Sequence, residues 1–252
     1  MIARSLRFPL ILLLALLLVL AWLRQAGPAP ARDARPANAL VPDFSQYQEV
    51  PEKKKAFFNF MRPLVEAENA RIITERSRLK SLLAKKKLSL AEQQWLDSLA
   101  IRYDLTPPLD EAAKTKLLRR VDKLPVALVL VQAANESAWG TSRFAVDGNN
   151  FFGQWCYVAG CGLVPQERID GASHEVARFA NPQASVRSYI HNINTNNAYL
   201  GLRQIRETAR QKGQEPKAEN LVQGLGRYSE RGRAYVRELT DMIGHNRRYM
   251  FD

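Results

Sequence analysis

"VDKLPVALVLVQAANESAWG", residues 121–140, decides the fold that we expect for this chain. Pro125 suits the first turn of a helix, and Gly140 suits the left-handed position that follows a helix end. Every residue from 126 to 131 is apolar, so the helix has no polar side to turn toward water. A helix of this kind is expected to be buried all round, in the core of a mainly helical domain.

A single carboxylate, Glu136, lies in the last turn of this helix. Outward-facing carbonyl groups and the negative end of the helix dipole disfavour an anion there, and the neighbours Ala133, Ala134 and Trp139 offer little solvation. Both effects raise the pKa of the carboxyl and keep it protonated nearer neutral pH, as a general acid requires. The alternative is an ordinary surface glutamate at a helix end, but the apolar helix favours a functional carboxyl.

Helical periodicity continues on both sides of this segment and is interrupted at residues 106–108 by Thr-Pro-Pro. Ser89 and Glu92 have the spacing of a capping box, Asn181-Pro182 has the pattern of a helix start, and Pro63 suggests a kink. The stretches expected to be helical are residues 52–87, 89–105, 183–196, 199–213 and 233–244.

The helical period breaks at "GLVPQERIDGASHEVARF", residues 162–179. Asp170-Gly171 between two short extended runs predicts a β-hairpin with a two-residue turn. In that register Glu167 lies opposite His174, and Glu175 lies opposite Gln166 on the other face. Hairpin carboxylates are usually solvated, so these acids alone indicate no chemistry.

The N-terminus predicts export. Two arginines precede an apolar run, Phe8 to Leu23, which has the length of a secretory signal and is short for a spanning helix. Arg24 follows directly, so an uncleaved inner-membrane anchor stays open for residues 1–24. Residues 25–43 are read as a Pro/Ala-rich linker, residues 44–106 as a helical extension, and residues 107–252 as the main domain. The expected location is the periplasm or cell envelope.

The net charge limits the classes of binding partner that we expect. The formal net charge of +12 favours anionic partners, but the basic residues are spread thinly and no nucleic-acid-binding motif is present, so nucleic acid is not expected.

Cys156 and Cys161 are predicted to form a disulfide in an exported protein, with a turn at Gly160. The three histidines show no ligand spacing with them, so no metal is expected.

Several motifs in one order resemble a known family. "NESAWGTSRFA", "GNNFFGQWC", a hairpin, "NPQASVRSYIHNINTNNAY" and "RYSERGRAYVRELTDMI" are similar to the Bax-like glucosaminidases of glycoside hydrolase family 73. The resemblance covers the chain from about residue 44 and is densest over residues 126–243. It implies a lysozyme-like, mainly α domain with a small β-hairpin. It also implies hydrolysis of peptidoglycan strands after N-acetylglucosamine, without a cofactor.

The resemblance assigns roles by position. The glutamate of the family's Glu-Ser-x-Trp-Gly motif falls on Glu136 as general acid, its second carboxylate on Glu167, and its tyrosine near the reacting sugar on Tyr228. For substrate binding we expect the flat faces of aromatic residues, the amides of the Asn-Asn loop, the second tyrosine of the motif and the histidine opposite Glu167. These residues are Trp139, Asn149, Asn150, Phe152, Trp155, His174 and Tyr235. For the aromatic residues alone core packing is the default explanation, and the loop in which they lie makes the two explanations equal.

Three points stay open in the sequence. Glu167 could activate water, or the N-acetyl group of the substrate could attack with Glu167 or Tyr228 orienting it. A lytic transglycosylase shares the fold and the helix-end acid, and a non-catalytic wall-binding protein would use the same aromatic residues. The partner in each case is peptidoglycan, bound by a monomer, with membrane contact through the N-terminal segment if that segment is not cleaved.

Overall fold

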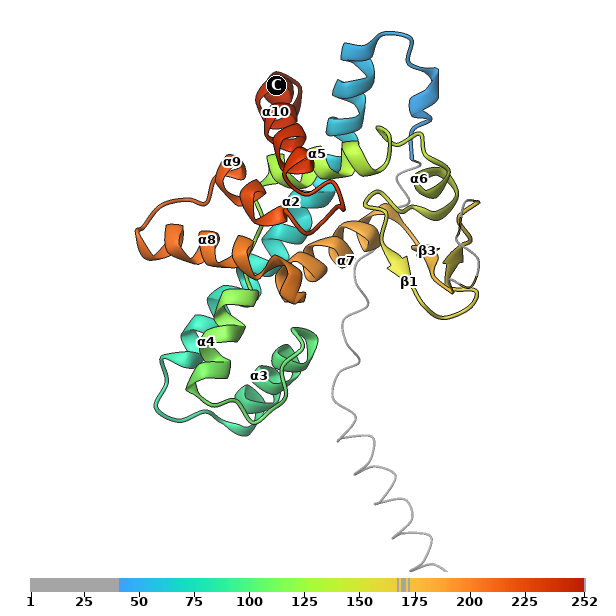
Figure 1. Ribbon diagram of the computed structural model, residues 1–252. Coiled ribbons are helices and arrows are strands. Elements are labelled where there is room, and N and C mark those ends of the chain that lie inside the picture. The colour runs from blue at the N-terminus through green and yellow to red at the C-terminus, as the bar shows by residue number, and fades with distance from the viewer. Residues whose placement is uncertain (1–40, 167, 169–170, 172, 252) are drawn as a thin grey trace, which may run out of the picture. The chain divides into compact units, whose positions relative to one another are not determined.

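Helix α5, Val126–Glu136, lies in the centre of the fold, as its apolar sequence predicts (Figure 1). The structure is a computed structural model that describes residues 41–166, 168, 171 and 173–251. Every residue of α5 from Ala127 to Ala134 is buried. The helix contacts α2, α9 and α10, so three separate parts of the sequence cover its surface.

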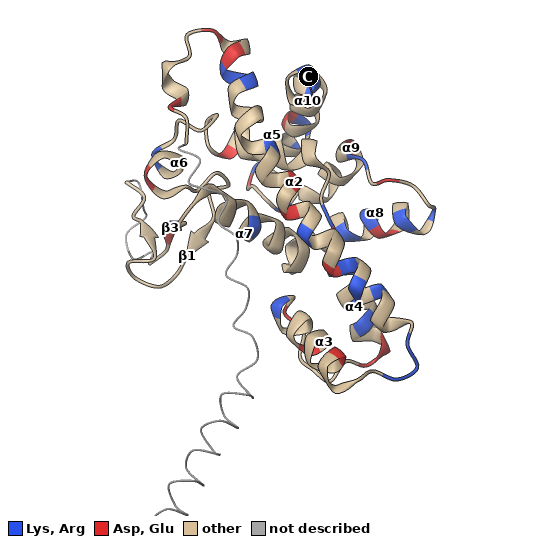
Figure 2. Cartoon of the chain, turned by 180° about the vertical axis from the view of Figure 1, so that it is seen from behind, with Lys and Arg blue, Asp and Glu red and all other residues tan. Residues whose placement is uncertain are grey.

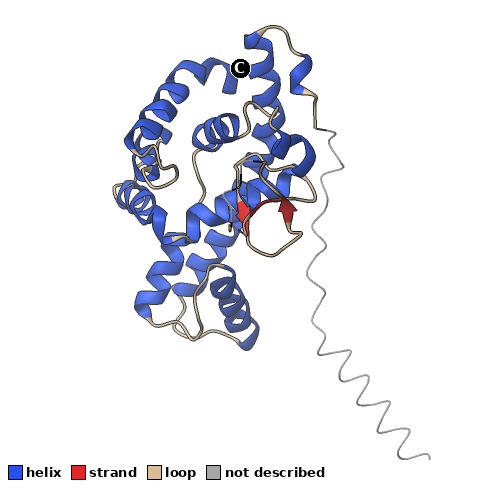
Figure 3. Cartoon of the chain, turned by 45° about the vertical axis from the view of Figure 1, so that its right-hand side comes forward, coloured by secondary structure: helices blue, strands red, loops and turns tan. Residues whose placement is uncertain are grey.

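The described chain is mainly helical, with three very short strands (Figure 3), which confirms the predicted fold class. The predicted N-terminal segment 1–24 and residues 25–40 of the predicted linker 25–43 lie outside the described residues, as do Glu167 and Asp170. The remaining elements are η1 (Phe44–Gln46), α2 (Val50–Leu83), α3 (Leu90–Arg102), α4 (Glu111–Arg120), α6 (Arg143–Gly148), β1 (Trp155–Cys156), β2 (Gly162–Leu163), β3 (Glu175–Ala177), α7 (Pro182–Thr195), η2 (Asn197–Tyr199), α8 (Leu200–Gln211), α9 (Ala218–Leu221), η3 (Val222–Leu225) and α10 (Arg233–Met250).

Helix α2 belongs to the same core as α5. It continues through Pro63 and contacts α5, α7 and α10. Phe57, Phe58, Met61 and Val65 of this helix are fully buried in one cluster with the apolar residues of α5. From Val41 onward the contacts define one unit, so the helices predicted to form an extension contribute to the core that carries α5.

Helix ends follow the local sequence signals. Ser89 and Glu92 form the predicted capping box at the start of α3, and the Asn181 side chain accepts from the Ala184 N–H at the start of α7. The helices expected near residues 199–213 and 233–244 are α8 and α10. None of the described helices is long and apolar enough to cross a bilayer.

The sheet differs from the predicted hairpin. Its order is β1-β3-β2, and both pairings are antiparallel. Leu163 pairs with Val176, whereas the predicted two-residue turn would have placed Pro165 there. Proline cannot donate a hydrogen bond to the ladder, so the strand ends before it. Gly162 is required at the pairing, because a Cβ atom there would lie 2.0 Å from the carbonyl oxygen of Val176.

The backbone segment that precedes α5 is held in place by a side-chain amide of α2. Asn69 is buried, and its Nδ2 donates to the Leu124 carbonyl at 2.8 Å while its Oδ1 accepts from the Leu124 N–H at 3.1 Å. Leu124 immediately precedes Pro125, the N-cap of α5. This pair of bonds satisfies a buried backbone segment that lies outside any helix or sheet and fixes where α5 begins.

We predict that Asn69→Asp lowers the free energy of unfolding by about 1–3 kcal/mol, because the carboxylate cannot donate to the Leu124 carbonyl and leaves it unsatisfied. Asn59→Asp is the matched control, since Asn59 is exposed on the same helix. Denaturant unfolding of the two variants measures the difference. Equal stability of the two variants would show that the Leu124 contact does not hold the helix start.

Candidate active site

Glu136 is the last residue of α5, and the chain turns sharply away directly behind it. Ala138, Trp139 and Gly140 have positive φ values of 50°, 59° and 78°. Ser137 stabilises this turn, because its hydroxyl donates to the Ala133 carbonyl and accepts from the Gly140 N–H at 2.8 Å. The turn leaves the carboxyl group at the exposed end of an otherwise buried helix.

Burial raises the pKa of the Glu136 carboxyl above its ordinary value, since desolvation penalises the anion. A hydrogen bond that the Tyr235 hydroxyl donates to Glu136 Oε1 at 2.7 Å opposes this effect. Asn135 Nδ2 also donates to Oε1, at 3.4 Å. Desolvation is the larger effect, so the group is shifted toward the protonated form that the sequence predicts.

Glu136 opens into a cleft of about 610 Å³. The walls come from the loop after α6, from α7 and the turn that follows it, and from the loop before α10. Among the described residues that line it, Glu136 is the only charged one; the others are Phe152, Gly153, Gln154, Trp155, Tyr157, Ser188, Asn192, Asn196, Tyr199, Tyr228 and Ser229. The site therefore combines one acid with aromatic and amide side chains, as a site for neutral sugars does.

Four of the predicted residues meet in this cleft: Glu136, Phe152, Trp155 and Tyr228. The Tyr228 hydroxyl donates to the Phe152 carbonyl at 2.9 Å, and its ring is stacked on Tyr235 with centroids 5.6 Å apart. Trp155 is 58% exposed at the rim. It stacks on His174 at 4.1 Å, so these two predicted residues form one flat surface.

Other residues predicted to bind substrate have contacts within the fold. Trp139 packs edge-on against Phe57 and Phe58 of α2 and does not line the cleft. Asn149 has φ 51° at the end of α6. Its Nδ2 donates to the Phe179 carbonyl at 3.0 Å.

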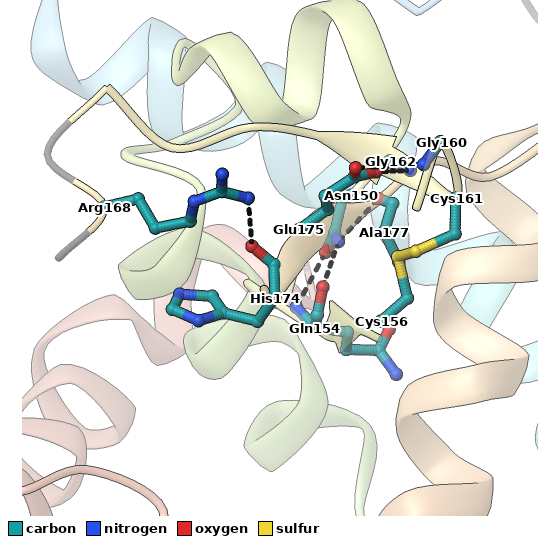
Figure 4. Close-up of a disulfide and its surroundings, with 10 residues drawn as sticks. All are labelled: Asn150, Gln154, Cys156, Gly160, Cys161, Gly162, Arg168, His174, Glu175 and Ala177. Atoms are coloured by element: carbon teal, nitrogen blue, oxygen red, sulfur yellow. Dashed lines mark hydrogen bonds between the residues drawn. A yellow bond between two sulfur atoms is a disulfide. The ribbon is translucent and has the colours of Figure 1, made fainter. Parts of the chain in front are cut away.

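Asn150 is buried and also forms bonds within the fold. Its Nδ2 donates to the carbonyls of Gln154 and Ala177, and its Oδ1 accepts from the Gln154 N–H (Figure 4). The Oδ1 also accepts from the Phe152 N–H. Each of its hydrogen-bonding atoms is thus occupied. We therefore leave Trp139, Asn149 and Asn150 out of the sugar-binding set proposed below.

The loop beside the rim is closed by the predicted disulfide between Cys156 and Cys161 (Figure 4), which confirms that prediction. Glu175 lies close to both sulfur atoms, a grouping that could suggest a metal site. The sulfurs are bonded to each other, however, and the carboxylate oxygens accept from the N–H groups of Gly160 and Gly162 at 2.9 and 2.7 Å. The carboxylate therefore holds the loop backbone.

Known proteins resemble this chain in sequence. Residues 112–248 match the glucosaminidase family, described as mannosyl-glycoprotein endo-beta-N-acetylglucosaminidase. The chain belongs to this family. Protein bax of Escherichia coli strain K12 is 33% identical over 213 residues, which cover 84% of this chain and 76% of that protein. No solved structure matches the chain. Glucosaminidases are glycoside hydrolases, so the chain belongs to a family of such enzymes.

The cleft also contains polar residues that were not predicted from the sequence. Ser188, Asn192 and Asn196 line it along α7 and its C-terminal cap. Their spacing of four residues places them on one helix face, and this is the signal by which they could have been found. Tyr199 follows them in η2 and completes this wall.

We predict that Glu136→Gln raises the thermal unfolding midpoint at neutral pH. The wild-type pKa is raised in the folded state, so the wild type loses stability as pH rises above the ordinary value of 4.5 through the raised one. The neutral amide has no such loss, and the difference should vanish below the ordinary value, where both side chains are uncharged. Unfolding scans across pH measure this. A variant no more stable than the wild type at neutral pH would contradict it.

Glu175→Gln should act in the opposite direction. The two backbone N–H groups lower the pKa of the Glu175 carboxyl, so its stabilising effect is present above the ordinary value and is lost as pH falls through the lowered one. The variant should unfold at a lower temperature at neutral pH, with the gap closing in acid. Glu66→Gln, at an exposed position of α2, is the control. A gap that stays constant with pH would show a purely steric effect.

Proposed function

We propose that this protein hydrolyses the β-1,4 bond after N-acetylglucosamine in peptidoglycan, with Glu136 as the general acid. The observation that carries the proposal is the position of Glu136 at the end of a buried helix and on the wall of a cleft whose other described lining residues are uncharged. A glycosidic bond breaks through an oxocarbenium-like transition state, and the departing oxygen needs a proton. Burial raises the pKa of the Glu136 carboxyl, so the group retains that proton to higher pH than an ordinary glutamate does.

The cleft walls fit a sugar that carries an amide. Tyr228 and the Trp155–His174 stack offer flat faces to pyranose rings. Phe152 is 2% exposed and its ring is stacked on Tyr189, so it supports the wall from behind. Ser188, Asn192 and Asn196 offer hydroxyl and amide groups to the N-acetyl group and the ring hydroxyls. These contacts would orient the scissile oxygen toward Glu136.

For the second half of the reaction we propose Glu167 as the partner carboxylate. It either activates a water molecule or orients the N-acetyl group of the substrate, and Tyr228 is placed in the cleft to support the reacting sugar. Glu167 lies outside the described residues, so its role rests on its position in the family motif.

Charge separates capture from cleavage in this proposal. Lysine and arginine residues are spread over α2, α4, α8 and α10 (Figure 2), and the net charge is +12. An anionic wall polymer would be attracted to these helices, while the cleft itself receives the uncharged sugar. The proposed location is accordingly outside the cytoplasm, at the cell wall.

The decisive test is hydrolysis of purified peptidoglycan by Glu136→Gln. The amide preserves shape and accepts the Tyr235 hydrogen bond, but it cannot act as an acid, so we expect release of reducing ends to fall by about 10²-fold or more. Glu66→Gln should retain wild-type activity. Near wild-type turnover by the folded Glu136→Gln protein would remove Glu136 from the proposal.

Mass analysis of the products from the same reactions identifies the chemistry. Reducing N-acetylglucosamine ends support the proposed hydrolase. Anhydro sugar ends would instead identify a lytic transglycosylase, and binding to peptidoglycan without cleavage would identify a wall-binding protein.

A further inference from the structure

A chain of buried hydrogen bonds leads from the core to Glu136. It comprises Tyr189 of α7, Gln132 of α5 and Tyr235 of α10, with exposed fractions of 0%, 0% and 2%. Gln132 lies one helical turn before Glu136 on the same helix. Water has no access to these side chains, so each polar atom must be satisfied by its neighbours.

The bonds run in one direction. The Tyr189 hydroxyl donates to Gln132 Oε1, Gln132 Nε2 donates to the Tyr235 oxygen at 3.0 Å, and the Tyr235 hydroxyl donates to Glu136 Oε1 at 2.7 Å. Reversing the Gln132 amide would reverse the whole chain. The Tyr189 hydroxyl, fully buried, would then lose its acceptor, which is costly in a core.

The two carboxyl oxygens of Glu136 therefore differ. Oε1 accepts from Tyr235 and Asn135. Among the described residues, no group donates to Oε2, which faces Gly153: a Cβ atom on Gly153 would lie 3.9 Å from it. Gly153 lines the cleft, so Oε2 is the oxygen on the substrate side.

We propose that Tyr189, Gln132 and Tyr235 are positioning residues that hold the transferable proton of Glu136 on Oε2, toward the cleft. With Oε1 occupied by donors, a proton on Oε1 would oppose the Tyr235 hydroxyl, whereas a proton on Oε2 points at the leaving oxygen. This inference rests on the proposed role of Glu136 as general acid, but its geometry can be tested without substrate.

The electrostatics agree with this direction. Burial raises the pKa of Tyr189 and of Tyr235 above the ordinary tyrosine value, so both remain donors at any working pH. Two further tyrosines, Tyr199 and Tyr228, also face the carboxyl and have raised pKa values. The charged groups that act on it, Arg231 and Glu238, are paired with each other at 2.7 Å and act in opposite senses.

The test is the pKa of Glu136 in Tyr235→Phe, measured by NMR titration of ¹³C-labelled glutamate carboxyls and assigned with Glu136→Gln. Donation from Tyr235 favours the anion, so its removal should raise the pKa of Glu136. The alkaline limb of the kcat/KM profile on peptidoglycan should move upward with it. Tyr249→Phe is the control, because that hydroxyl lies on the same helix and accepts from Arg248. It should leave both values unchanged.

The sign of the shift decides the outcome. If Glu136 instead donated its proton to Tyr235, removal of the hydroxyl would lower the pKa, and a fall or no change overturns the proposal. Gln132→Met is a second variant of similar volume should Tyr235→Phe fold poorly. It should give a smaller upward shift, because Tyr235 keeps its bond to Glu136 but loses the donor behind it. If Tyr235→Phe raises the pKa of Glu136 but the wild-type protein does not cleave peptidoglycan, the hydrogen-bond chain is supported and the proposed function is rejected.

Discussion

Burial of α5 from Ala127 to Ala134 is the constraint on which the rest of the structure depends. A helix with apolar residues all round must be covered on every side, and α2, α9 and α10 provide that cover from distant parts of the sequence. The C-terminal end of the helix stays near the surface, where Ser137 and the three left-handed residues after it turn the chain away. The carboxyl at that end is partly desolvated as a consequence of the packing.

The same packing determines which groups can reach Glu136. Because α10 lies against α5, the Tyr235 hydroxyl bonds to the carboxyl directly, and the Tyr189 hydroxyl of α7 bonds to Gln132. The polar atoms of the core are thus connected to the acid in the cleft. The helices that build the core also orient and moderate the acid, so folding and the proposed chemistry share the same side chains.

The sequence predicted those features that local rules determine. The apolar run of α5, the capping box at Ser89 and the Asn181 cap depend on a few neighbouring residues, and all were confirmed. The strand register was wrong because it depends on Pro165 and on the close approach of Gly162 to Val176, which is a contact across the sheet. Glu136 and Tyr235 were both singled out as site residues, but the hydrogen bond between them was not predicted, since the two lie 99 residues apart.

Asn150 and Trp139 show a second limit of prediction from the sequence. Both occur in a motif that resembles a sugar-binding loop, and residue type alone cannot distinguish an amide that binds substrate from one that binds backbone. The structure gives Asn150 four hydrogen bonds to backbone groups of the loop and of β3 and places Trp139 against α2, so these residues shape the cleft from behind. The surfaces that face the cleft are instead provided by Trp155, Tyr228 and the polar face of α7. A loop that is rigid because its amides are occupied holds its aromatic rim in place, and that rigidity is what orientation of a sugar beside a fixed acid requires.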